Sequence, residues 1–303
     1  MKLKSTWSVL EESLEILNGY AFSAAGKAAE ELSLPAGYFT WVQAIWLFDA
    51  NPFSITQFMR CLPYGLAQVN DERLASAVGD GYLDSDGLGV YRATELGRSA
   101  ALQLIQAGIE LTATLTPMPK ESLRMLGNLL ARISGGAFHS PEPSAHVLIK
   151  AKRDFYERIG AFAVLEGVIT HCLMLEGHRD DCYFATWSAH GVEGHAWEVI
   201  DVLSQSDALT FDELHAKLSR RGVTEEVHAG DVRELVGRGW VEESSGVVKA
   251  TEAGKQVRAE VEAETERLFF APWSCLNESE LEELASLAVR LRDGLQAMKG
   301  EER

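Results

Sequence analysis

The chain repeats itself at an interval of about 157 residues (Thr94 to Thr251), and this repeat limits its fold more than any other feature. Trp41 aligns with Trp197, and the same offset aligns Ser54 with Thr210. Small shifts in the offset fall where loops are expected, and apolar positions mostly stay apolar. Further matches are Leu74 with Val232, Gly81 with Gly239, Gly97 with Gly254, and Leu126 with Leu284. Agreement over this length predicts an internal duplication.

Each repeat begins with helices. A helix with apolar periodicity surrounds the first tryptophan of the repeat. A short helix follows, with Ser54 or Thr210 in position to cap it. A second short helix is expected at about 69–79 in the first repeat and 225–237 in the second.

A glycine-bearing hairpin and two longer helices complete each repeat. The hairpin segments read GYLDSDGLGVYRAT and GWVEESSGVVKAT, so two short strands flank a turn. Thr94 and Thr251 can cap the next helix, and Gly97 and Gly254 would let that helix pass close to the hairpin backbone. A leucine-striped helix closes the repeat. This order predicts a mainly α fold with small β-hairpin wings, a tandem winged helix-turn-helix protein.

A Pro- and Ser-rich segment, HSPEPS, separates the repeats. We expect a first winged-helix repeat with its N-terminal helix at 1–137, a linker and central helix at 138–189, and a second winged-helix repeat at 190–303. The run Ser134-Gly135-Gly136 is interpreted as a helix stop before the linker. Residues 144–187 are expected to form a long helical stretch, the counterpart of the helix around residues 7–33.

Two family resemblances follow from these segments. The stretch from LTFDELHAKLSRRG to VRELVGRGWVEESSGVVKATEAGKQVRAEVEAETERL resembles the winged-helix domain of MarR-type regulators. Almost the whole chain also resembles the SalK-like family, an actinobacterial group of tandem helix-turn-helix proteins. That second resemblance is carried by Gly19-Tyr20-Ala21-Phe22, Leu34-Pro35, Glu176-Gly177-His178-Arg179-Asp180-Asp181, Gly191-Val192-Glu193-Gly194 and Ala271-Pro272-Trp273. It implies the fold and a helix-turn-helix label, but no established reaction.

The charge of the chain argues against ordinary DNA binding. MarR-like proteins are usually homodimers that place two recognition helices in successive major grooves, roughly 34 Å apart, and a tandem repeat could imitate such a dimer. However, the net charge of −17 repels polyanions. The expected recognition helices contain Asn70-Asp71-Glu72-Arg73 in one repeat and Glu225-Glu226-Val227-His228 with Asp231 in the other. Carboxylates that face phosphates lower affinity.

Basic side chains near these helices remain the candidates for a nucleic-acid contact. They are Arg220, Arg221, Arg233, Arg238, Lys249 and Lys255 in the second repeat, and Arg92 and Arg98 in the first. The alternative is a solvated surface of mixed charge. We therefore expect DNA binding that is weak or depends on a partner.

The apolar run from Ile159 to Leu175 is expected to be a buried central helix and not a membrane span, because it contains Glu166 and His171. A buried Glu166 would favour its neutral form unless it is paired, and a pocket is a natural place for such a group. Glu166, His171, Trp41 and Trp46 are the candidates for a ligand pocket. The alternative is that the aromatic residues are core and that the helix holds one satisfied polar pair.

A polar cluster follows in the segment HCLMLEGHRDDC. His178, Asp181 and Cys182 have helical spacing, and Arg179 lies among them. Such a cluster could hold a transition metal, but it matches no known metal signature, and bonds to neighbouring backbone are the alternative. No metal ligand, cofactor or catalytic residue is assigned. Four scattered cysteines and the lack of a signal peptide predict free thiols and a cytoplasmic protein.

Three functions remain open. The first is a ligand-responsive regulator in which tandem winged units enclose an apolar pocket. The second is a scaffold whose acidic faces bind other proteins and never DNA. The third is an enzyme or a sequestering protein that uses Glu166, His171 and His178 in a cavity between the repeats.

Overall fold

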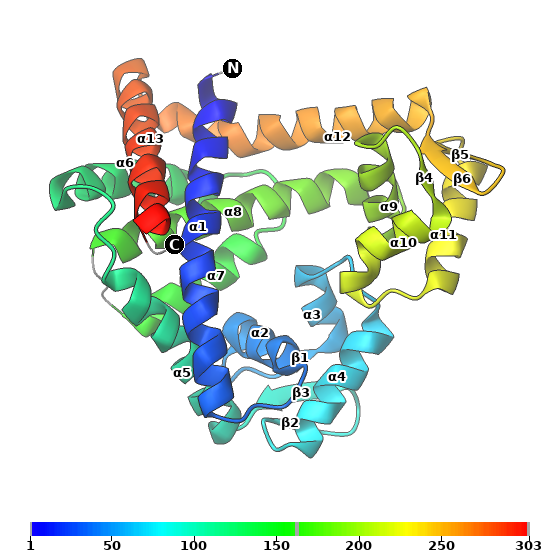
Figure 1. The fold of residues 1–303 in the computed structure, drawn as a ribbon, viewed down its shortest axis with the longest axis horizontal. Helices are drawn as coiled ribbons and strands as arrows, with labels where there is room; N and C mark the ends of the chain where they lie inside the picture. The colour runs from blue at the N-terminus through cyan, green and yellow to red at the C-terminus, as the bar shows by residue number, and fades with distance from the viewer. Residues whose placement is uncertain (1, 161–163, 302–303) are drawn as a thin grey trace.

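The computed structural model describes residues 2–160 and 164–301, which are mainly helical with two small sheets (Figure 1). The first elements are α1 (Lys2–Glu31), α2 (Tyr38–Phe48), β1 (Phe53–Ser54), α3 (Ile55–Cys61), α4 (Ala67–Gly79), β2 (Leu83–Ser85), β3 (Val90–Ala93), α5 (Glu95–Ala113) and α6 (Lys120–Phe138). They are followed by α7 (Leu148–Ile159), α8 (Val164–Ser188), α9 (Gly194–Ser204), β4 (Leu209–Thr210), α10 (Phe211–Leu218), the 3-10 helix η1 (Ser219–Arg221), α11 (Glu225–Gly237), β5 (Val241–Ser244), β6 (Val247–Ala250), α12 (Glu252–Phe270), the 3-10 helix η2 (Ala271–Cys275) and α13 (Glu278–Glu301). The expected order of helices and hairpin is found twice.

The segment from α2 to β3, residues 38–93, forms the first winged unit. Its sheet has the order β1-β3-β2 and is antiparallel, with Phe53 opposite Tyr91. Phe53, Phe58 and Leu74 are almost completely buried in a core that this unit forms with the start of α5. The short strand β1, which the sequence pattern did not predict, closes the sheet on one edge.

The segment from α9 to β6, residues 194–250, forms the second winged unit. Its sheet has the corresponding order β4-β6-β5, with Leu209 opposite Val248. The core of this unit is separate and contains Trp197, Leu214 and Leu235. The two winged units therefore share both element order and strand order.

The helix caps confirm the sequence prediction at equivalent positions. Ser54 begins α3 with a capping box, and Thr210 begins α10 in the same way. Thr94 and Thr251 each accept a bond from the backbone N–H three residues later. The hydroxyl of each also donates to the carbonyl oxygen that precedes the wing strand, at Gly81 in one unit and Gly239 in the other.

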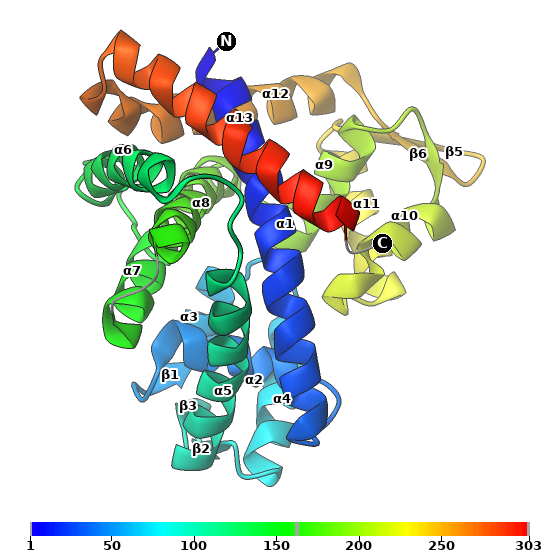
Figure 2. The ribbon, with the colours of Figure 1, turned by 60° about the vertical axis from the view of Figure 1, so that its left-hand side comes forward.

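The long helices form a third core beside the winged units, and their contacts are reciprocal between the two halves. The first long helix, α1, packs on the last, α13, while α6 packs on α8 (Figures 1 and 2). Gly136 on α6 faces Pro272 in η2, and Gly294 on α13 lies against the carbonyl oxygen of Pro117 before α6. In each case a helix from one half packs against the connection to the corresponding helix of the other half.

Two expectations about the middle of the chain are wrong. The helix α6 does not stop at Ser134 but continues to Phe138, because Gly135 and Gly136 are accommodated as helical residues. Residues 144–187 do not form one helix, since α7 ends at Gly160 with a positive φ of 97°. Residues 161–163 of the apolar run lie outside the described residues. The separate helix α7 packs beside α8.

Within the described residues, none of the helices combines the length and the apolar character needed to cross a membrane.

Candidate ligand pocket and helix-turn-helix surface

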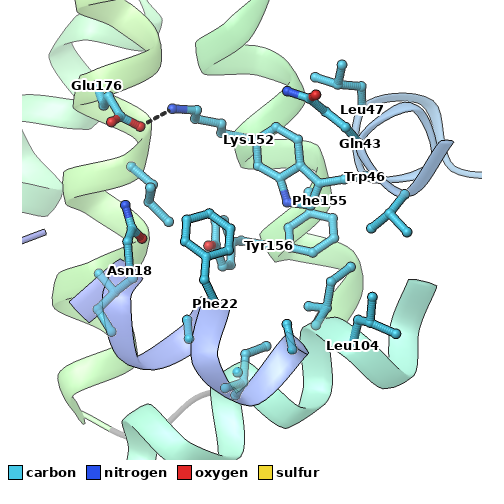
Figure 3. Close-up of a pocket in the computed structure, with 18 of the residues that line it drawn as sticks. Asn18, Phe22, Gln43, Trp46, Leu47, Leu104, Lys152, Phe155, Tyr156 and Glu176 are labelled. Carbon is cyan, nitrogen blue, oxygen red and sulfur yellow. Dashed lines mark hydrogen bonds and ion pairs between the residues drawn. The ribbon is translucent and has the colours of Figure 1, made fainter. Parts of the chain in front are cut away.

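A cavity of about 540 Å³ lies between the first winged unit and the central helices (Figure 3). Residues of α1, α2, α5, α7 and α8 line it, and the end of α3 reaches it. The aromatic residues of the lining are Phe22, Tyr38, Phe39, Trp46, Phe155 and Tyr156. The polar ones are Asn18, Gln43, Thr112, Lys152, Glu166, Glu176 and Asp180. The volume and the mainly apolar lining are typical of sites for drug-sized molecules.

An ion pair borders this cavity (Figure 3). The buried ammonium of Lys152 on α7 lies 2.6 Å from Oε2 of Glu176 on α8. Asp180 lies one turn further along α8, and burial raises the pKa of its carboxyl to about 6. Lys152 lowers that pKa and Glu176 raises it. One ammonium therefore faces two carboxyl groups on this wall.

Glu166 is the most deeply buried carboxyl group of the lining. Its side chain is 2% exposed, and its Oε1 lies 2.5 Å from Oγ1 of Thr112 on α5. Burial raises the pKa of Glu166, while the hydrogen bond with Thr112 lowers it. The Thr112 hydroxyl donates to Oε1 of Glu166 and also lies 3.0 Å from the carbonyl oxygen of Gly108.

The cavity side of α8 follows helical periodicity. Glu166, Ile169, Leu173, Glu176 and Asp180 all line the cavity and are spaced by three or four residues. In the sequence, helical spacing counted from Glu166 places Glu176 and Asp180 on the same face of the helix. Lys152 lacked such a signal, because its place depends on how α7 packs on α8.

Of the four residues that the sequence offered as pocket candidates, Glu166 and Trp46 line the cavity, whereas His171 and Trp41 do not. His171 follows Glu166 by five residues, which turns it about 140° around the helix. Its Nδ1 lies 3.0 Å from Oγ of Ser134 on α6, and burial lowers the pKa of the imidazole. Trp41 is 2% exposed and lies in the core of the first winged unit.

The residues of the polar cluster on α8 contact different partners and do not form a single site. The carboxylate of Asp181 accepts bonds of 2.9–3.2 Å from the backbone N–H groups of Val147, Leu148 and Ile149, and so caps the start of α7. Arg179 forms an ion pair with Glu262 on α12. These contacts hold neighbouring helices on α8.

His178 and Cys182 are fully buried on this helix. Nε2 of His178 lies 3.7 Å from Sγ of Cys182. Burial lowers the pKa of His178 to about 4, helped by His146, whose ring stacks on it at 6.0 Å. Burial also raises the pKa of the Cys182 thiol to about 12, so both side chains are neutral at pH 7. Among the residues that the structure describes, no group of three or more His, Cys, Asp or Glu is arranged to hold a metal ion.

The second helices of the two helix-turn-helix motifs, α4 and α11, keep most of their acidic residues at the surface, and Glu72 of α4 is exposed. Asn70 of α4 and His228 of α11 are buried. Asp231 is buried as well, with its carboxylate 2.9 Å from Nδ1 of His195. The carboxylates that remain exposed on α11 include Glu225, Glu226 and Glu234.

Most of the basic candidates for DNA contact are engaged in ion pairs. The pairs are Arg98 with Asp49, Arg221 with Glu198, Arg238 with Glu234, Lys249 with Glu242 and Lys255 with Glu252. Arg238 also donates to the carbonyl oxygens of His190 and Gly191. Arg92, Arg220 and Arg233 are exposed and form no ion pair within the described part of the chain.

The two winged units touch at their helix-turn-helix motifs. The guanidinium carbon of Arg221 lies 5.0 Å from the ring centre of Tyr64, which precedes α4. Gly222 faces Val69 and Arg73 on α4, and the backbone of Gly194 at the start of α9 lies against the carbonyl oxygen of Pro63. The turn before α11 therefore packs on the first part of α4.

These features define a protein with two winged helix-turn-helix units beside an apolar cavity. The model of a helix-turn-helix family matches residues 136–300, more than half of the chain, so the chain belongs to this helix-turn-helix family. The match covers the end of α6, the central helices and the second winged unit. No curated protein and no solved structure gives a match.

Proposed function

We propose that this protein is a ligand-responsive regulator in which a small molecule in the cavity controls how the two winged units are arranged. One observation carries the proposal. The cavity is lined on one side by α2 and the end of α3, which belong to the first winged unit, and on the other by α7 and α8. A bound molecule would touch the helix-turn-helix unit and its frame at the same time.

The two halves act in this proposal as the two subunits of a MarR-like dimer joined in one chain, as in the SalK-like group. The shared element order and the reciprocal packing support an internal duplication. Gly136 meets Pro272 and Gly294 meets Pro117, which is the exchange of contacts that a two-fold axis produces. The domain division that goes with this proposal is 1–137, 138–189 and 190–303.

The arrangement of the units opposes tight DNA binding. A dimer that reads successive major grooves holds its recognition helices roughly 34 Å apart. Here the turn before α11 is packed on α4 through Gly222, Val69 and Arg73. Arg221, a basic candidate, is held by Glu198 and Tyr64 in the same contact. We infer that DNA binding requires the contact to open.

The ligand would favour the closed arrangement. A molecule that fits the cavity binds best to the arrangement in which α2, α7 and α8 form the cavity walls. A ligand shifts an equilibrium toward the state that it binds more tightly, so it would stabilise the closed contact and lower DNA affinity.

Native mass spectrometry combined with mobility shift on genomic DNA fragments tests the proposal. We expect the purified chain to carry a small molecule, and Ala25→Phe, which fills the cavity, to lose it. Ala24→Phe is the matched control, because Ala24 is on the same helix but outside the lining. A ligand-loaded chain that binds fragments in the micromolar range at physiological salt would contradict the proposal.

A further inference from the structure

The charged groups of the cavity are unbalanced. Its lining contains the carboxyl groups of Glu166, Glu176 and Asp180, but the only ammonium or guanidinium in it is that of Lys152, counted over the described lining. Lys152 is already committed to Glu176 at 2.6 Å. An anionic ligand would find no uncommitted cation there, whereas a cationic ligand would find two further carboxyl groups.

Glu166 is the strongest part of this imbalance. It is buried, and its hydrogen bond in the cavity is with the hydroxyl of Thr112 and not with a cation. A carboxylate in such surroundings gains much when a cation reaches it, because the interaction of two charges grows as the effective dielectric constant falls.

Aromatic rings surround the same space. The ring centres of Phe22 and Phe39 are 6.3 Å apart, and those of Trp46 and Phe155 are 5.3 Å apart. Figure 3 shows Phe22, Trp46, Phe155 and Tyr156 around the space beside the ion pair. Phe22 and Phe39 are more than half exposed, so neither ring belongs to a packed core. Neighbouring exposed aromatic rings beside a cavity are typical of a binding site. Ring faces attract cations and apolar bodies alike.

We propose that the cavity takes an organic cation of drug size, an apolar or aromatic body that carries an ammonium or another onium group. This rests on the proposed function, since it names the ligand class of the same cavity. The aromatic rings enclose the body, and the carboxylate of Glu166 faces the positive charge. Glu176 and Asp180 add to the negative potential of the opposite wall.

Tetraphenylphosphonium and tetraphenylborate provide the test, because the two ions have nearly the same size and shape and opposite charge. We expect calorimetry on the full chain to show micromolar binding of the cation and at least tenfold weaker binding of the anion.

Variants of the lining separate charge from shape. Glu166→Gln should weaken binding of the cation about tenfold, while Lys152→Met should tighten it several-fold. Glu226→Gln on the exposed face of α11 is the control and should leave binding of the cation unchanged. Melting curves verify that each variant folds, and the isosteric Glu166→Gln carries the test where Lys152→Met does not fold.

The outcomes distinguish the two proposals. Preference for the borate, or equal binding of both ions, would overturn the cation assignment and leave a ligand-responsive regulator standing. Binding of neither ion would also overturn the cation assignment, while a small molecule found by native mass spectrometry would still support the proposed function.

Discussion

The backbone of Gly194 lies so close to the carbonyl oxygen of Pro63 that a Cβ atom on Gly194 would overlap it. Gly194 begins α9 of the second winged unit, and Pro63 lies between α3 and α4 of the first. Only glycine permits this approach. The contact between the two units therefore depends on one missing side chain.

Gly194→Ala should separate the units. The added methyl group would force the backbones apart at a cost of roughly 1–3 kcal/mol. We expect a larger radius of gyration by small-angle X-ray scattering and at least tenfold tighter binding of genomic DNA. Gly19→Ala is the control, because nothing lies within 4 Å of a Cβ atom there. Unchanged scattering and DNA binding in Gly194→Ala would show that the contact does not restrain the units.

Gly97→Ala and Gly254→Ala should be equally harmful. A Cβ atom on Gly97 would overlap the carbonyl oxygen of Tyr82, and one on Gly254 would overlap that of Trp240. We expect each to lower the free energy of unfolding by about 2 kcal/mol or more. Gly19→Ala should be neutral or stabilise by up to about 1 kcal/mol. Denaturant titrations measure all three, and a harmless change in one half would contradict the equivalence of the halves.

These glycines show what could be predicted from the sequence. Gly97 and Gly254 were expected to allow close approach because each follows a threonine cap at the same spacing. The contact of Gly194 with Pro63 could not be foreseen, since it joins surfaces that are distant in sequence and belong to different units. Local signals such as caps, hairpins and periodicity specify each unit, but they do not specify how two finished units meet.

The cavity was predicted in part for the same reason. Glu166 stood out as a carboxyl group in an apolar run, and it lines the cavity. His171 stood out equally, but the turn of α8 carries it toward Ser134. Lys152 carries no comparable signal in the sequence, because its place in the cavity wall depends on how α7 packs beside α8.

Asp181→Asn should loosen α7. The carboxylate of Asp181 accepts bonds from the first backbone N–H groups of α7, including that of Leu148 at 2.9 Å. An amide keeps one acceptor oxygen and loses the charge, so we expect a loss of about 1–2 kcal/mol and faster hydrogen exchange along α7. Glu226→Gln is the control, because Glu226 lies exposed on α11 and does not cap α7. Equal exchange in the two variants would argue against the capping role.

His178 should make stability depend on pH. Its pKa is about 4 in the folded chain, below the ordinary 6.5, because burial opposes its charged form. Between pH 6.5 and 4 the unfolded chain binds the proton and the folded chain does not, so stability falls as the pH is lowered through this window. At pH 7 the group is neutral in both states and costs nothing.

Carboxyl groups with a raised pKa, such as Asp180, make the folded chain more stable as the pH falls, which opposes the effect of His178. Both the parent and His178→Gln contain these carboxyl groups, so the difference between the two proteins isolates the contribution of His178. On going from pH 7 to pH 4, the unfolding free energy of the variant should rise by about 3 kcal/mol relative to that of the parent. Denaturant titrations at each pH measure it. A constant difference would mean that His178 is not held neutral.

The distance between the two recognition helices tests the central claim most directly. Spin labels at Ala75→Cys on α4 and Glu226→Cys on α11, in a Cys275→Ser background that removes the exposed thiol, report it by double electron–electron resonance. The account predicts a distance between the two labels well below roughly 34 Å. This distance should increase in Gly194→Ala, and its distribution should become narrower when a ligand occupies the cavity. A broad distribution near 34 Å that neither the variant nor a ligand changes would contradict it.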